Sequence, residues 1–108
     1  MSEVVVVAII TAAAGHEQAV QDLATSVIAE THREEGCIAY ALHRDVGDPT
    51  RFVYVERWAS LETLTAHGAS AHIARFREAL QPLAGAPSQV LVLEPLPAGE
   101  SAKGTLAG

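Results

Sequence analysis

One short segment near the middle of the chain carries the side chains best suited to chemistry. Tyr54, Glu56 and Trp58 stand at alternate positions, so they share one face if this segment is a β-strand. A carboxyl group among aromatic rings loses hydration, and burial raises its pKa toward the range of a general acid or base. The sequence equally allows a structural Glu56 that pairs with Arg44, Arg57 or a helix terminus. We take Glu56 and Trp58 as candidate catalytic residues and Tyr54 as a candidate substrate-binding residue.

Two histidines follow this segment at positions suited to the same crevice. His67 lies on the apolar side of a short predicted helix, and His72 lies at the edge of the apolar stripe that contains Phe76. A histidine with an ordinary pKa of about 6.5 can accept and donate protons near neutral pH. Each histidine could equally be a capping or packing residue, and Trp58 could be a core residue. We take His67 and His72 as candidate catalytic residues and Phe76 as part of the pocket wall.

The segment before the central one adds two further candidates for substrate binding. Tyr40 and His43 point to opposite faces of a predicted strand. Which of them lies beside Glu56 depends on the register of the hairpin, and a five-residue turn leaves that register open. His16 and His32 are expected to be exposed on helices.

The sequence lacks the common motifs of metal and cofactor sites. It has no glycine-rich phosphate loop, no CxxC or HExxH motif and no serine-nucleophile elbow. His67 and His72 are five positions apart with Gly68 between them, so they do not share the i, i+4 face of a helical zinc pair. We therefore expect no cofactor and no metal.

Length and charge narrow the class of protein further. The chain has 108 residues, which fits one domain, and 13 acidic against 7 basic residues give a net charge of −6. Nucleic acid is an unfavourable partner for such a surface, because phosphate binding needs clustered Lys and Arg. The longest apolar run, from Val4 to Ala14, is shorter than the roughly 20 residues of a membrane-spanning helix. A single cysteine and the absence of a basic leader favour a cytoplasmic protein.

Periodicity gives the elements that position these side chains. The β-branched run 4–10 predicts a strand, and the apolar stripe that starts after Glu17 predicts a helix ended by Gly36. Strands are predicted over 37–46 and 51–59, with turn residues at 47–50. Ser60 and Ser70 are expected to cap two short helices; Gly68 interrupts the first, and Pro82 with residues 85–87 ends the helical region.

A final strand over 90–93 completes a β-α-β-β-α-β order. This order is the ferredoxin-like α+β fold with a four-stranded antiparallel sheet. We expect one domain over residues 1–96 and a flexible tail over 97–108, where the composition becomes rich in Pro, Gly, Ser and Ala.

Three of the predicted strands are apolar on both faces. Helices can cover only one face of such a sheet, so a second copy of the sheet is the simplest cover for the other. We therefore expect a homodimer with face-to-face sheets. The alternative is a monomer with a partly apolar surface.

A series of short elements along residues 3–96 resembles one known family. The elements are Glu35-Gly-Cys-Ile-Ala-Tyr40, His43-Arg-Asp45, Asp48-Pro49, Arg51-Phe52, Glu56-Arg-Trp58, Ala66-His67, Ala71-His72 and Phe76. Together they are similar to the antibiotic-biosynthesis monooxygenase family of dimeric α+β barrels, especially its small quinol monooxygenases.

The resemblance implies a homodimer with a pocket between sheet and helices. It also implies oxygenation of a phenolic or quinol-type substrate by dioxygen without a cofactor. Trp58 matches the tryptophan of the family, and His67 and His72 match its pocket-side histidines. Haem-degrading members use an asparagine on the first strand, where this chain has Ala8, and the chain contains no asparagine.

Three functions remain open at this point. The first is a cofactor-free monooxygenase that acts on a small aromatic or quinol-type metabolite. The second is a non-redox isomerase of small carbonyl compounds in the same pocket, and the third is a ligand-binding dimer without catalysis.

Overall fold

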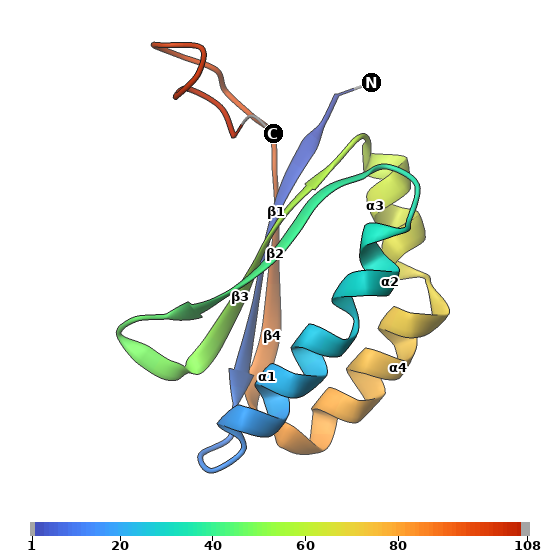
Figure 1. Cartoon of the computed structure of the whole chain (residues 1–108), viewed down its shortest axis with the longest axis vertical. Coiled ribbons are helices and arrows are strands. Elements are labelled where there is room, and N and C mark those ends of the chain that lie inside the picture. The colour runs from blue at the N-terminus through green and yellow to red at the C-terminus, as the bar shows by residue number, and fades with distance from the viewer. Residues whose placement is uncertain (1, 107–108) are drawn as a thin grey trace.

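The computed structural model describes residues 2–106 and confirms the β-α-β-β-α-β order (Figure 1). Each of the two helical segments is divided in two. The elements are β1 (Val4–Ala12), α1 (Glu17–Ser26), α2 (Ile28–His32), β2 (Cys37–Asp45), β3 (Asp48–Trp58), α3 (Leu61–Gly68), α4 (Ala71–Leu80), a 3-10 turn (Gln81–Leu83) and β4 (Ala84–Leu93).

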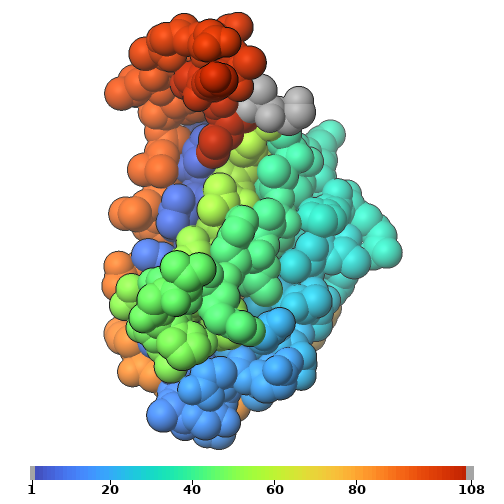
Figure 2. Space-filling view, turned by 60° about the vertical axis from the view of Figure 1, so that its left-hand side comes forward, coloured from blue at the N-terminus to red at the C-terminus, as the bar shows by residue number. Residues whose placement is uncertain are grey.

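The four strands form one antiparallel sheet in the order β2-β3-β1-β4. All the helices lie on one face of this sheet, as Figure 1 shows. Figure 2 shows the four strands side by side on the other face, with the segment after β4 projecting at one end. The chain is therefore a two-layer α+β domain with one helix-free face.

The hairpin between β2 and β3 is tighter than the sequence predicts. Asp45 pairs with Asp48, so only Val46 and Gly47 form the turn, and the expected start of the strand at Arg51 is wrong by three residues. The Asp45 carboxylate accepts the Gly47 N–H at 2.8 Å and closes the turn locally. Pro49 is tolerated because this end of β3 extends beyond the β1 pairing, which stops at Arg51.

The last strand is longer than its apolar run. β4 begins at Ala84, so the expectation that residues 85–87 end the helical region without joining the sheet is wrong. Register shifts occur against β1 at Thr11, and Pro87 fits there because β4 is an edge strand. The strand therefore extends along nearly the whole of β1.

Hydroxyl side chains set the limits of the helices. Ser60 accepts the Thr63 N–H, and the Thr63 hydroxyl accepts the Ser60 N–H, which confirms the predicted cap with a reciprocal box. Ser70 caps α4, also as predicted. In the first helical segment, Thr25 and Ser26 donate to carbonyls one turn back, and this competition accompanies the unexpected break at Val27.

The core lies between the sheet and the helices. Large side chains of β3 dominate it: Phe52, Tyr54 and Trp58 are at most 2% exposed. The Tyr54 hydroxyl donates to the Ala24 carbonyl of α1 at 2.6 Å, which fixes this helix against the sheet. The strand with the candidate chemistry is thus also the centre of the packing.

The remaining described segment has little regular structure. No helix or strand occurs between Glu94 and Leu106, and the flexibility of the tail stays a prediction, with residues 107 and 108 outside the described part. Within residues 2–106, no helix has the length and apolar character needed to cross a membrane.

The turn at Gly36 allows a stability test. Gly36 has a φ of +84°, and a Cβ there would lie 2.4 Å from the Thr63 side chain, whereas Gly15 has a φ of +88° and open space around it. Gly15→Ala should lower the free energy of unfolding by about 1 kcal/mol through backbone strain alone. Gly36→Ala should cost at least about 2 kcal/mol, because steric overlap adds to the strain. Urea unfolding of both variants measures the difference, and equal losses would contradict the packing of Gly36 on α3.

Candidate active site

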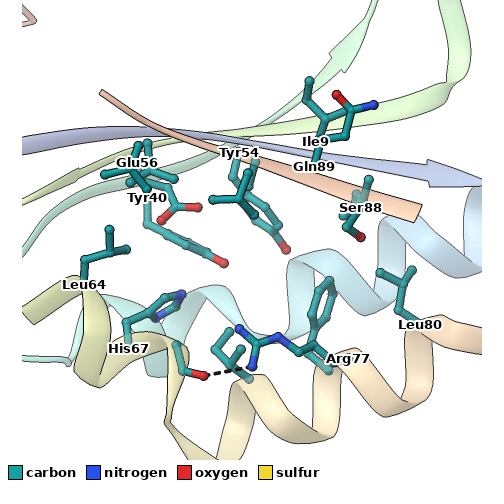
Figure 3. A pocket seen from close by; sticks show the side chains of 18 residues that line it. Ile9, Tyr40, Tyr54, Glu56, Leu64, His67, Arg77, Leu80, Ser88 and Gln89 are labelled. Atoms are coloured by element: carbon teal, nitrogen blue, oxygen red, sulfur yellow. Dashed lines mark hydrogen bonds between the residues drawn. The ribbon is translucent and has the colours of Figure 1, made fainter. Parts of the chain in front are cut away.

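A cavity of about 310 Å³ lies between the sheet and helices α3 and α4 (Figure 3). Its walls come from every strand and from both helices. The lining residues are Val6, Ala8, Ile9, Ile10, Tyr40, Tyr54, Glu56, Leu64, His67, Gly68, Ile73, Phe76, Arg77, Leu80, Ser88, Gln89, Val90 and Val92. Most are apolar, so the cavity suits a small, largely apolar ligand.

The cavity borders on the edge strand β4. Val90 and Val92 line it, yet they are 61% and 50% exposed, because the helices do not reach this edge of the sheet. This edge is therefore the open side through which a ligand can enter.

Glu56 is the carboxyl group of this cavity. It is 3% exposed, and its Oε1 accepts the Trp58 indole N–H at 2.9 Å. Burial raises the pKa of Glu56 to about 7; the indole hydrogen bond opposes the rise and the Glu34 charge adds to it. At neutral pH, Glu56 is therefore present in both its protonated and its ionised form, as a group that transfers protons requires.

Two tyrosines flank Glu56. The hairpin register places Tyr40 opposite Glu56, which settles the open choice between Tyr40 and His43. The Tyr40 and Tyr54 rings stack with centroids 4.5 Å apart. Burial is the main cause that raises the pKa of both phenols, so both remain neutral hydroxyls at physiological pH.

His67 faces the sheet from α3. It is 7% exposed, and its ring lies 4.6 Å from the Trp58 ring and 5.4 Å from the Tyr40 ring, between centroids. Burial lowers the pKa of His67, although the Glu34 carboxylate opposes the shift. His67 Nδ1 lies 2.6 Å from Glu34 Oε2, so a neutral ring that donates from Nδ1 keeps Nε2 as an acceptor.

Glu34 is a site residue that the sequence reasoning missed. It lies between α2 and β2, and one of its oxygens contacts both His67 and His72. In the sequence it belongs to a charged run just before Gly36 and reads as solvated. Its one unusual feature is an acidic side chain just beyond a helix C-terminus, where the helix dipole disfavours negative charge.

The structure brings five of the eight predicted residues to the cavity wall: Tyr40, Tyr54, Glu56, His67 and Phe76. Trp58 is fully buried behind Glu56 and does not line the cavity. It contacts the site through its hydrogen bond to Glu56 and its packing on the His67 and Tyr40 rings.

The other two predicted residues lie elsewhere. His72 is turned toward Glu34 and is absent from the cavity wall, because it starts a new helix after the break at Gly68–Ser70. His43 is exposed and pairs with Val53. Because it is three positions from Tyr40 on the same strand, its side chain lies on the opposite, helix-free face. The structure therefore does not place His72 or His43 on the wall of this cavity, and their roles stay predictions.

Arg77 and Ala8 complete the wall in ways that bear on the ligand. Arg77 is the only Lys or Arg among the lining residues; it donates to the Gly68 carbonyl at 2.9 Å and forms no ion pair within the described part of the chain. Ala8 lies opposite Tyr54 and contributes only a methyl group. The wall thus contains one cationic side chain, and at Ala8 it has no side-chain amide such as that of asparagine.

Fold and site together define a small α+β protein of the ferredoxin-like type with a cavity for an apolar ligand and groups for proton transfer. Residues 3–79 match the profile of the antibiotic biosynthesis monooxygenase family, and the chain belongs to that family. Comparison with curated proteins gave no match.

Solved structures agree with this assignment. PA3566 from Pseudomonas aeruginosa is 29% identical with a TM-score of 0.82, over 89% of this chain and 96% of that one. Rv0793 from Mycobacterium tuberculosis is 29% identical with a TM-score of 0.84, over 92% and 100%. A protein described as an antibiotic biosynthesis monooxygenase is 26% identical with a TM-score of 0.81, over 87% and 99%.

The raised pKa of Glu56 predicts a pH-dependent stability. Below about pH 4.5 the carboxyl is protonated in both states, and up to about pH 7 only the folded protein holds the proton. The stability that this proton contributes is therefore lost as the pH rises through 7. Relative to Glu56→Gln, the wild type should lose up to about 3 kcal/mol of unfolding free energy across that window. Urea unfolding at several pH values measures it.

Trp58→Phe is the matched control for this experiment. It keeps the carboxyl and removes the indole N–H that lowers the pKa of Glu56. The pKa should therefore rise further, and the loss of unfolding free energy should continue to a higher pH than in the wild type. A difference between wild type and Glu56→Gln that does not change with pH would contradict the assignment.

Proposed function

We propose that the chain is a monooxygenase that oxidises a small phenolic, quinol or anthrone-type compound with dioxygen and without a flavin or metal. The observation that carries the proposal is the Glu56 carboxyl, with its pKa of about 7, in the wall of an apolar cavity with aromatic sides. Figure 3 shows this carboxyl beside Tyr40 and facing the space above His67. Membership of the monooxygenase family supports the reaction class.

The first step is removal of a proton from the substrate. Ionised Glu56 accepts the proton, and the neutral hydroxyl of Tyr40 remains a hydrogen-bond donor for the substrate oxygen, whereas the Tyr54 hydroxyl donates to the Ala24 carbonyl. Arg77 supplies a positive charge at the wall, which favours the resulting organic anion. Apolar walls exclude water and so strengthen these interactions.

The second step is reduction of dioxygen by the substrate anion. In an anthrone-type substrate, two C–H bonds are replaced by one C=O bond. One oxygen atom enters the product and the other leaves as water, so the substrate supplies all four electrons. The protein contributes binding, orientation and proton transfer, for which no external reductant is needed.

A second candidate function uses the same groups without oxygen. A carboxylate base beside neutral tyrosine hydroxyls also suits proton transfer next to a carbonyl group, as in an isomerase. The requirement for dioxygen separates the two activities.

Catalysis is tested by oxygen uptake with an anthrone or quinol substrate and protein free of flavin and added metal. Glu56→Gln should lower kcat by at least about 100-fold, because a positioned base contributes that much. The wild-type kcat/KM should rise as the pH increases through about 7, when Glu56 ionises. Glu62→Gln, the same change on the exposed side of α3, should leave both values unchanged.

Three outcomes decide between the functions. Oxygen uptake that depends on Glu56 supports the monooxygenase. Conversion of a carbonyl substrate under nitrogen selects the isomerase. Saturable binding with no turnover under either gas leaves a ligand-binding protein and rejects both enzymes.

We also propose that the protein works as a homodimer joined through the helix-free face. That face carries apolar side chains on all four strands: Val5, Val7, Ala39, Ala41, Val53, Val55, Leu91 and Leu93. Leu91 and Leu93 are 52% and 42% exposed in the single chain. Apolar side chains on all four strands of an uncovered sheet face favour burial against a second copy of that face.

Sedimentation at micromolar concentration should give a dimer. Leu91→Lys should dissociate it, because a charge would be buried in an interface of more than roughly 2,000 Å². The same change at Val46, which is fully exposed in the β2–β3 turn, should leave the dimer intact. A monomeric wild type would reject the interface.

A further inference from the structure

Three potential metal ligands converge next to the cavity, and one of them, His67, also belongs to its wall. Glu34, His67 and His72 each offer one ligand atom, and these atoms all lie within 4.8 Å of one another. Glu34 Oε2 is 2.6 Å from His67 Nδ1 and 3.2 Å from His72 Nε2. Both imidazoles thus point at a single carboxylate oxygen.

The break between α3 and α4 produces this convergence. His67 lies in the last turn of α3 and His72 in the first turn of α4, so each ring is directed by a different helix. Glu34 comes from the segment before β2, which Gly36 turns against α3. The five-residue spacing argued against a zinc pair on one helix, but that argument does not apply to two helices.

The surroundings of the cluster favour the binding of an ion, because they are shielded from solvent and contain further oxygen atoms. The three side chains are only 9–17% exposed, so water competes weakly. Two hydroxyl oxygens stand next to His72 Nε2, Thr31 Oγ1 at 3.4 Å and Ser70 Oγ at 3.5 Å. A site with three protein ligands therefore has nearby groups that can supply or hold a fourth, including through a water molecule.

We propose that Glu34, His67 and His72 bind one divalent transition-metal ion, for which Zn²⁺ is the best-suited probe. Two imidazole nitrogens and one carboxylate oxygen form a known zinc ligand set, with Zn–N and Zn–O distances near 2.0–2.2 Å. The oxygen of Glu34 occupies the point where both rings converge. A shift of this carboxylate away from that point opens the position for the ion.

Two consequences follow for the chain. The ion links residues 33 and 38 positions apart in the sequence, so it holds the segment before β2 against both helices. It also replaces the proton on His67 Nδ1, and a neutral ring then carries its proton on Nε2. His67 therefore changes from an acceptor to a donor at Nε2.

Binding is tested on the full chain without a polyhistidine tag. Isothermal titration with Zn²⁺ should give one ion per chain, and the melting temperature should rise with zinc concentration. Co²⁺ in place of Zn²⁺ should give the visible absorption of a four-coordinate site with nitrogen and oxygen ligands. None of these measurements depends on the proposed enzymatic activity.

Substitutions locate the ion. His72→Ala and Glu34→Gln should each weaken zinc binding at least about 100-fold, since even the outer partners of such sites contribute 10–100-fold. Using both variants protects the test if one of them folds poorly. His16→Ala, an exposed histidine before α1, should bind as tightly as the wild type. Cys37→Ser should also retain binding, because the thiol is not part of the cluster.

The proposal fails on any of three results. These are no stoichiometric binding, binding that survives both His72→Ala and Glu34→Gln, or binding lost in Cys37→Ser or His16→Ala. In each case the cluster is a hydrogen-bonded group of two histidines on one carboxylate and nothing more.

Discussion

The desolvation of a carboxyl group on the central part of the sheet determines how readily the wall of the cavity holds a proton. Glu56 sits on β3 at a position where its neighbours along the same face are aromatic, and only the Trp58 indole donates to it among the described side chains. Burial of such a group is unfavourable when it is charged, so its proton is held more tightly than in water. The fold tolerates this because the surrounding rings contribute large apolar contacts to the core.

The helical layer determines how much of that buried surface is open to a ligand. One continuous helix would be free to pack along the whole strand, whereas the serine-capped break between α3 and α4 keeps the two helices short and differently aimed. The cavity lies under this break and extends to the edge of β4. The same break places His67 in the cavity wall and His72 outside it, although both rings contact Glu34.

Local patterns predicted the elements well and long-range contacts poorly. Alternation along residues 52–58 placed Glu56 and Tyr54 on one face, and the two serine caps were visible as residue types. The hairpin register could not be predicted in this way. The turn has two residues, whereas the sequence suggested five, and the length of the turn determines which residues pair. Glu34 escaped notice because its partners lie 33 and 38 positions away.

The misplacement of Trp58 has a related cause. Alternation assigns a side chain to a face but not to a depth, and the depth is set by which helix packs above it. Trp58 lies under α3 and is fully buried, while Tyr54 and Glu56, four and two positions earlier, reach the cavity. The extent of β4 was equally hidden, since Pro87 is compatible with a strand only at a sheet edge.

The pairing of β1 with β4 has a consequence for the order in which the protein can be completed during synthesis. These two strands are neighbours in the sheet but come from opposite ends of the domain's sequence, and β4 supplies the wall of the cavity at Ser88, Val90 and Val92. While the chain emerges from the ribosome, β1, β2 and β3 can already form a three-stranded sheet, because the pairings among them involve residues before 59. The cavity acquires its outer wall only when the residues up to Leu93 are free to pair with β1. The cavity is therefore the last part of the domain to be completed.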